Sequence, residues 1–200
     1  MNRKVWILIV LLSILLVACG ATDQSNEASS GADEANSGNE NQNQTAAEVI
    51  EPTVGEGAVK IGAPAPHFRL QAVDGQVVDL SELKGQAVVL NFWATWCGPC
   101  RAEMPELEAA YQENRDNGLQ LIGIEIRKSG NADQSALFLK QAGTTFPNVR
   151  DQDGLMEQRY VKRPAYPTTI FIDREGVVSY VQLGPMNKEF IEERLNDLGF

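Results

Sequence analysis

The tetrapeptide Cys97-Gly98-Pro99-Cys100 constrains the fold most, because it follows the apolar run of residues 87–93 after only three intervening residues. A continuous apolar run of this length is typical of a central strand that is covered on both faces. Proline suits the first turn of a helix, so the sequence predicts a helix from about Pro99 to residue 114. The two thiols would therefore lie where a strand hands over to a helix.

This position favours thiol chemistry. A helix N-terminus carries a partial positive charge and unpaired backbone N–H groups, and both stabilise a thiolate. Cys97 precedes the helix, so we expect it to be exposed and to act as the nucleophile. Cys100 lies about one turn inside, where access is lower, and would resolve the mixed disulfide that Cys97 forms. The pattern predicts dithiol–disulfide exchange.

Two other uses of the cysteine pair are open to the residues. Zinc usually takes four ligands, and His67 is the only histidine that could join the pair. A purely structural disulfide would close a loop too short to stabilise the fold much. We therefore expect no metal and no cofactor beyond a redox-active Cys97–Cys100 disulfide.

The rest of the chain from residue 58 alternates between strand and helix periodicity, which is an α/β signature. An Asp74-Gly75 turn predicts an early hairpin, and Pro105 predicts a kink in the helix after the cysteines. Strands are expected at residues 68–73, 76–80, 88–93, 119–126, 168–173 and 177–182, and helices at 99–114, 134–141, 155–160 and after Asn187. This order predicts a central mixed sheet flanked by helices, with an N-terminal β-hairpin extension.

The first residues indicate export. Residues 5–17 are apolar except for Ser13 and follow a short basic start, which fits a signal-peptide core better than a membrane span of about 20 residues. Leu16-Val17-Ala18-Cys19 resembles the lipobox of bacterial lipoproteins, which implies a signal peptide at residues 1–18 and a lipid on Cys19. The alternative is a retained membrane helix in which Cys19 is an ordinary apolar residue. Either reading tethers the domain to the outer face of the cell membrane.

Residues 19–57 follow as a predicted disordered tether, and residues 58–200 as the folded domain. Residues 20–57 hold eight acidic residues and no Lys or Arg, within a background of small polar residues. The remainder, without signal peptide and tether, has 15 basic and 19 acidic residues, a net charge of −4. It has no basic patch, so the sequence offers no nucleic-acid partner. We expect a monomer.

Three segments resemble one known family. Phe-Trp-Ala-Thr-Trp-Cys-Gly-Pro-Cys at residues 92–100 is similar to the active site of the thioredoxin superfamily, and of its membrane-tethered TlpA/ResA branch in particular. Residues 62–68 at the domain entry and residues 166–169 before a late strand support the same resemblance. It covers about residues 59–200 and implies a thioredoxin-like fold with protein thiol-disulfide oxidoreductase activity.

The resemblance also implies roles for residues outside the tetrapeptide. Pro167 matches a family proline that is cis and lies against the first cysteine. The backbone of Tyr166 would then face an extended substrate, in a groove shared with Trp96 and with Gly98 and Pro99. Trp93 is expected in the core instead.

Proton handling departs from the superfamily pattern. A buried Asp commonly lies six residues before the first cysteine, but Asn91 occupies that position here and cannot titrate. Glu103 resembles the helix glutamate of the ResA branch and could act as general acid and base. Its alternative is an ordinary solvated acid favoured by the helix dipole. Glu125 also has two possible roles, as a second carboxylate of the pocket or as an ordinary residue at the end of a strand. His67 is expected to be an exposed histidine or one whose hydrogen bonds are satisfied, without a role in the chemistry.

The direction of electron flow rests on Gly98-Pro99, the dipeptide of reducing thioredoxins. Pro99 lacks an N–H to stabilise a thiolate, which favours a reductant. The expected partners are exported proteins with disulfides, including apocytochrome c in the family that the chain resembles, and a membrane thiol carrier that donates electrons. The alternatives are a thiol oxidant, a non-catalytic binding module, and a thiol peroxidase. The last has little support, because Leu90 and Trp93 stand where a peroxidatic motif requires proline.

Overall fold

The computed structural model describes residues 50–200. The predicted signal peptide, the predicted lipid site at Cys19 and most of the predicted tether lie outside the described residues. Within the described part, no helix has the length and apolar character that crossing a membrane requires.

A five-stranded mixed sheet forms the centre of the domain, in the order β6-β5-β4-β7-β8. Strands β4, β5 and β6 are parallel, and β7 and β8 run antiparallel to them. The strand bounds are β4 (Ala87–Trp93), β5 (Leu119–Glu125), β6 (Asn148–Arg150), β7 (Thr168–Ile172) and β8 (Val178–Leu183). The mixed sheet and the late β7–β8 hairpin confirm the predicted fold class.

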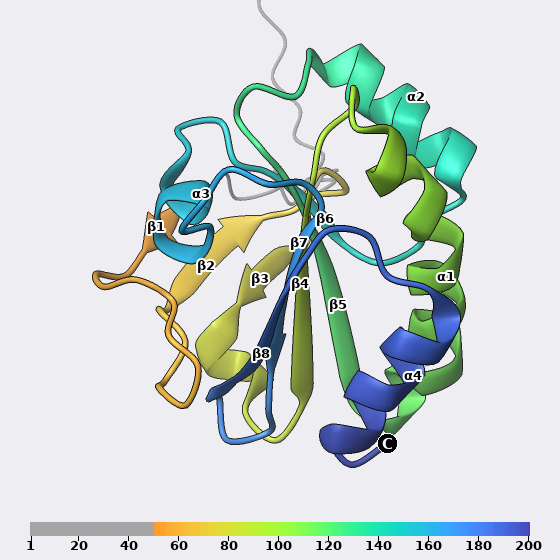
Figure 1. The fold of residues 1–200 in the computed structure, drawn as a ribbon. Helices are drawn as coiled ribbons and strands as arrows, with labels where there is room; N and C mark the ends of the chain where they lie inside the picture. The colour runs from red at the N-terminus through yellow and green to blue at the C-terminus, as the bar shows by residue number, and fades with distance from the viewer. Residues whose placement is uncertain (1–49) are drawn as a thin grey trace, which may run out of the picture. The chain divides into compact units, whose positions relative to one another are not determined.

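Four α-helices flank this sheet (Figure 1). They are α1 (Gly98–Asn114), α2 (Ala132–Ala142), α3 (Leu155–Tyr160) and α4 (Lys188–Asp197), and two short 3₁₀ turns occupy Leu80–Leu83 and Arg115–Asn117. Helices α1 and α4 pack against each other beside the sheet, and α2 also contacts α1. Helix α3 lies near the N-terminal strands.

Strand β4 is the structural centre because all seven of its residues are buried. Strands β5 and β7 pair with its two edges, and the burial of every side chain shows that both faces are covered, as the apolar run predicted. Its last residue, Trp93, stacks on Phe138 of α2 with ring centroids 4.5 Å apart, and its indole N–H donates to Asn148 Oδ1 at 3.1 Å. Trp93 is therefore a core residue, as predicted, and it fixes the end of β4 from which the cysteine loop departs.

The N-terminal extension is larger than the predicted hairpin. Strands β2 (Phe68–Gln71) and β3 (Val77–Asp79) form that hairpin, with Gly75 at φ 89° in its turn. A further strand, β1 (Thr53–Val54), pairs with β2, and Ile50 is buried. The boundary predicted at residue 58 is therefore wrong: polar composition pointed to a tether, but backbone pairing with β2 draws residues 50–57 into the domain.

Candidate active site

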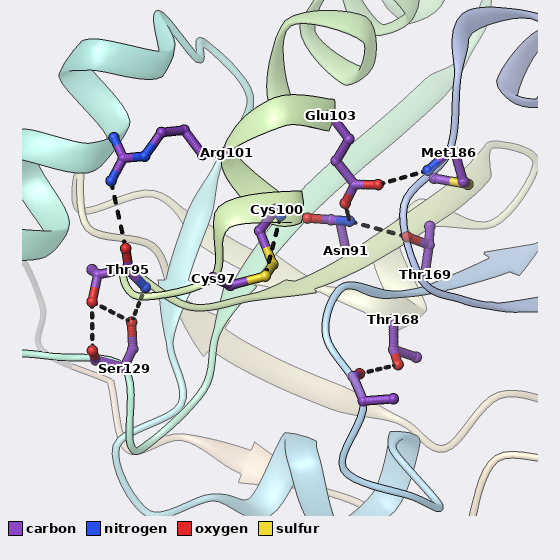
Figure 2. The surroundings of a disulfide bond; sticks show 11 residues. Asn91, Thr95, Cys97, Cys100, Arg101, Glu103, Ser129, Thr168, Thr169 and Met186 are labelled. Carbon is purple, nitrogen blue, oxygen red and sulfur yellow. Dashed lines mark hydrogen bonds between the residues drawn. A yellow bond between two sulfur atoms is a disulfide. The ribbon is translucent and has the colours of Figure 1, made fainter.

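Cys97 and Cys100 form a disulfide at the start of α1 (Figure 2). Cys97 is the N-cap residue, and its sulfur accepts a hydrogen bond from the Cys100 backbone N–H at 3.1 Å. Gly98 and Pro99 form the first helical positions and are exposed. The strand-to-helix junction thus has the geometry that the tetrapeptide predicted, with a sulfur at the positive end of a 17-residue helix.

The expected exposure of Cys97 is wrong. The residue is only 4% exposed, and Cys100 is fully buried. The reason is the cap geometry: the Cys97 sulfur turns back over the first turn of α1, where it meets both the N–H and the sulfur of Cys100. Cys97 is still more accessible to solvent than Cys100, as predicted, but the difference is small in the disulfide state.

A buried polar cluster lies beside the disulfide (Figure 2). Glu103, one turn after Cys100, is 2% exposed, and its Oε1 accepts a hydrogen bond from Asn91 Nδ2 at 2.8 Å. Glu103 Oε2 accepts from the backbone N–H of Met186 at 3.1 Å. Asn91 Nδ2 also lies 3.0 Å from Thr169 Oγ1. The cluster thus joins β4, α1, β7 and the segment before α4.

Burial dominates the electrostatics of Glu103. Removal from water raises the pKa of its carboxyl to about 7, although the hydrogen bonds from Asn91 and Met186 oppose the shift. The alternative of a solvated helix acid is therefore excluded. A carboxyl with a pKa near neutrality can both release and take up a proton at ordinary pH, which is the property that an acid–base group beside a thiol needs.

The rim of the site is aromatic. Trp96 is 61% exposed, its indole N–H donates to the Lys128 carbonyl at 2.8 Å, and its ring meets Tyr166 edge-on with centroids 6.0 Å apart. The Tyr166–Pro167 bond is cis, as predicted. A depression of about 580 Å³ opens beside the two aromatic side chains and extends to α3. Of the residues predicted to line a substrate groove, Trp96 and Tyr166 are thus gathered on one rim, whereas Gly98, Pro99 and Pro167 do not line this depression.

Glu125 and His67 lie outside this cluster. Glu125 ends β5, is 2% exposed, and pairs with Arg150 Nε at 2.9 Å while it accepts a hydrogen bond from Ser135. It is an ion-paired residue that joins β5 to β6 and α2. His67 lies in the N-terminal extension, half exposed and 3.0 Å from Asp79, so it is a satisfied surface histidine, as expected.

Sequence reasoning missed several residues of the site. Thr169 and Met186 contact Asn91 and Glu103 from positions 78 and 83 residues away. Thr169 ends the segment 166–169 that supports the resemblance, but no local pattern marks either residue as a partner of this cluster. Ser129 was also missed: its Oγ accepts from the Thr95 N–H at 2.8 Å and so fixes the loop before Cys97. Among residues 50–200, no three His, Cys, Asp or Glu side chains are grouped to hold a metal ion.

A redox disulfide at the N-terminus of a helix, on a mixed sheet of this topology, defines the thioredoxin class of thiol–disulfide exchange proteins. Residues 61–181 match the AhpC/TSA family, and the chain belongs to that family within the thioredoxin superfamily. It is an oxidoreductase of the thiol–disulfide type.

Named relatives agree with this class. The chain is 35% identical over 142 residues to the thiol-disulfide oxidoreductase ResA of Bacillus subtilis (strain 168), which covers 71% of this chain and 78% of ResA. It is 34% identical over 142 residues to the thioredoxin-like protein YneN of the same organism, with 70% of this chain and 82% of YneN covered.

Solved structures share the fold. A thiol:disulfide interchange protein of the thioredoxin family from Chlorobium tepidum TLS superposes with a TM-score of 0.62 at 28% identity, over 70% of this chain and 99% of that protein. StoA from Bacillus subtilis gives a TM-score of 0.56 at 28% identity, over 66% of this chain and 98% of StoA.

Proposed function

We propose that this protein is a lipid-anchored reductant on the outer face of the cell membrane, which reduces disulfides of exported proteins through Cys97 and Cys100. The main support for the proposal is the disulfide at the start of α1, where Gly98 and Pro99 are exposed between the two cysteines. The apolar residues 5–17 and the lipobox at Cys19 support the location.

The reaction begins from the dithiol form. The Cys97 thiolate attacks one sulfur of the substrate disulfide, so a Cys97–substrate bond forms and the other substrate sulfur leaves as a thiolate that takes up a proton. Deprotonated Cys100 then attacks the Cys97 sulfur, which closes the Cys97–Cys100 disulfide and releases the second substrate thiol. The substrate gains two electrons and two protons, and a membrane dithiol donor restores the enzyme by the reverse exchange.

Glu103 serves as the acid–base group of the second step. Its carboxyl is buried one turn beyond Cys100, and its pKa of about 7 lets it accept the proton that Cys100 must lose before it attacks. We assign Trp96 and Tyr166 to the substrate rim, because their rings contact each other and line the depression that adjoins them. Pro167 is assigned to the same rim through its cis bond to Tyr166.

The substrate class follows the relatives. ResA is named a thiol-disulfide oxidoreductase, and the resemblance to its branch supports the Cys-x-x-Cys-His segment of apocytochrome c as a substrate. A second function, a thiol peroxidase, is favoured only by the breadth of the AhpC/TSA family. Leu90 and Trp93, both fully buried in β4, occupy the positions that a peroxidatic proline would need.

The reduction potential of the Cys97–Cys100 couple tests the direction of electron flow. We expect a potential below about −250 mV, in the range of reducing thioredoxins, when the full chain is equilibrated with defined thiol–disulfide buffers. A potential above about −150 mV would instead identify a thiol oxidant.

A further inference from the structure

Asn91 holds one buried atom whose hydrogen-bonding capacity is unused. Its side chain, on β4, is fully buried. The amide nitrogen donates to Glu103 Oε1 at 2.8 Å and to Thr169 Oγ1 at 3.0 Å. An ionised Glu103 can only accept, so in that state these contacts fix the nitrogen on the side of Glu103 and leave the oxygen on the opposite side. This oxygen, Oδ1, has no hydrogen-bond partner.

An unpaired buried acceptor is unusual and destabilises the state in which it occurs. Figure 2 shows the Asn91 amide oxygen pointing toward Cys100. In the disulfide, the Cys100 sulfur is bonded to Cys97 and has no hydrogen to donate. The orphaned oxygen therefore faces a group that becomes a donor when the disulfide is reduced, because a thiol carries an S–H.

We propose that Asn91 is a redox-linked positioning residue, whose Oδ1 accepts the Cys100 S–H in the dithiol form while its Nδ2 holds Glu103 in place. The inference rests on the proposed exchange chemistry. When a donor dithiol reduces the disulfide, two electrons and two protons pass to Cys97 and Cys100, and the donor becomes a disulfide. The proton that stays on the Cys100 sulfur is the one that forms the bond to Asn91.

Two consequences follow for the reaction. The S–H bond to Asn91 is absent from the Cys97–Cys100 disulfide, so it stabilises the dithiol relative to the disulfide and raises the equilibrium constant for reduction. The bond also keeps Cys100 protonated, and an amide cannot remove the proton as an Asp at this position could. Cys100 therefore resolves the mixed disulfide only after its proton has moved to another group, and we assign that role to Glu103, which the same amide holds.

The direct test observes the S–H group. The full chain with Cys19→Ser and Cys97→Ala leaves Cys100 as the only thiol and removes Cys97 as a competing acceptor. We expect the Raman S–H stretching band of this protein to lie below the frequency of an unbonded thiol, and to return to that frequency when Asn91→Leu is added. Thr169→Val is the matched control, because it removes a contact of Nδ2 and leaves Oδ1 intact; the band should stay low. An unbonded frequency in the protein that retains Asn91 would overturn the proposal, whether or not the Asn91→Leu variant folds.

The second test uses the intact cysteine pair. We expect Asn91→Leu to lower the equilibrium constant for reduction about tenfold, which corresponds to a potential about 30 mV more negative for a two-electron couple. Thr169→Val removes a contact of Nδ2 and leaves Oδ1 intact, so it should shift the potential by less than Asn91→Leu does. An unchanged or more positive potential in Asn91→Leu would contradict the role of Asn91, whereas the exchange mechanism itself would fail only if Cys97→Ser retained full disulfide reductase activity.

Discussion

At the scale of single residues, burial and hydrogen bonding act on the Glu103 carboxyl in opposite directions, and burial prevails. The sequence placed Glu103 on the face of Cys100 because three residues separate them along one helix. It could not predict the depth of burial, because Met186 and Thr169 reach the cluster from distant segments. A local pattern fixes which way a side chain points, but only the folded topology decides what surrounds it.

The raised pKa of Glu103 predicts a pH dependence of stability. In the unfolded chain the carboxyl ionises near its ordinary pKa of 4.5, and in the folded protein near 7. The folded state therefore binds more protons between these values, so the free energy of unfolding falls as pH rises from 4.5 to 7, by at most about 3 kcal/mol. Urea denaturation of the oxidised protein at pH 5 and pH 8 measures this difference. Glu103→Gln should remove most of the difference in the free energy of unfolding between pH 5 and pH 8. If the variant keeps the same difference, other groups are responsible for it.

At the scale of secondary-structure elements, the periodicity predicted the four α-helices and six of the eight strands that residues 50–200 form. It missed the short strands β1 and β6, and it set the start of α2 two residues late. Asn131 caps this helix: its side chain accepts from the Gln134 N–H at 2.9 Å, and Gln134 bonds back to the Asn131 N–H. The helix therefore begins at Ala132, directly after its cap.

Removal of this cap should destabilise the domain without affecting the chemistry. We expect Asn131→Ala to lower the free energy of unfolding by about 1 kcal/mol, as for other N-cap asparagines. Asn196→Ala is the matched control, because Asn196 is exposed within α4, and it should change stability by less than about 0.5 kcal/mol. Chemical denaturation measures both. Equal effects of the two substitutions would argue against a capping role.

The Glu125–Arg150 ion pair joins β5 to β6. It should contribute more to the free energy of unfolding than the Asn131 cap does. Glu125 is almost fully buried, whereas the Arg150 side chain is 26% exposed. Arg150→Met would leave a buried carboxylate without its cation, so we expect a loss of about 3 kcal/mol, at the low end for buried pairs because Arg150 is partly solvated. The double variant Arg150→Met with Glu125→Gln should recover part of the loss. No recovery in denaturation experiments would show that Arg150 acts through packing rather than charge.

At the scale of the whole molecule, the apolar core was predictable from the sequence, and the N-terminal edge of the domain was not. Residues 50–57 read as part of an acidic tether because they contain few apolar residues. Their place in the fold depends on backbone hydrogen bonds, such as the Gly55 N–H to the His67 carbonyl at 2.7 Å, and backbone pairing leaves little trace in side-chain composition.

Deletion of residues 50–57 from the full chain tests the extended boundary. Loss of β1 and of the buried Ile50 side chain should lower the free energy of unfolding by about 2 kcal/mol. Deletion of residues 40–47 removes the same length of predicted tether and should leave stability unchanged. If thermal unfolding shows the same change in stability for both deletions, residues 50–57 do not belong to the folded domain and the boundary lies at residue 58.

The most direct test of the central claim is the capture of partners as mixed disulfides on the full chain. Cys100→Ser removes the resolving thiol, so the account predicts that partners with disulfides accumulate on Cys97 as adducts that dithiothreitol releases. Cys97→Ser, the matched variant, should accumulate far fewer, because the nucleophile is absent. Equal capture by the two variants, or no capture by Cys100→Ser, would contradict Cys97-initiated exchange.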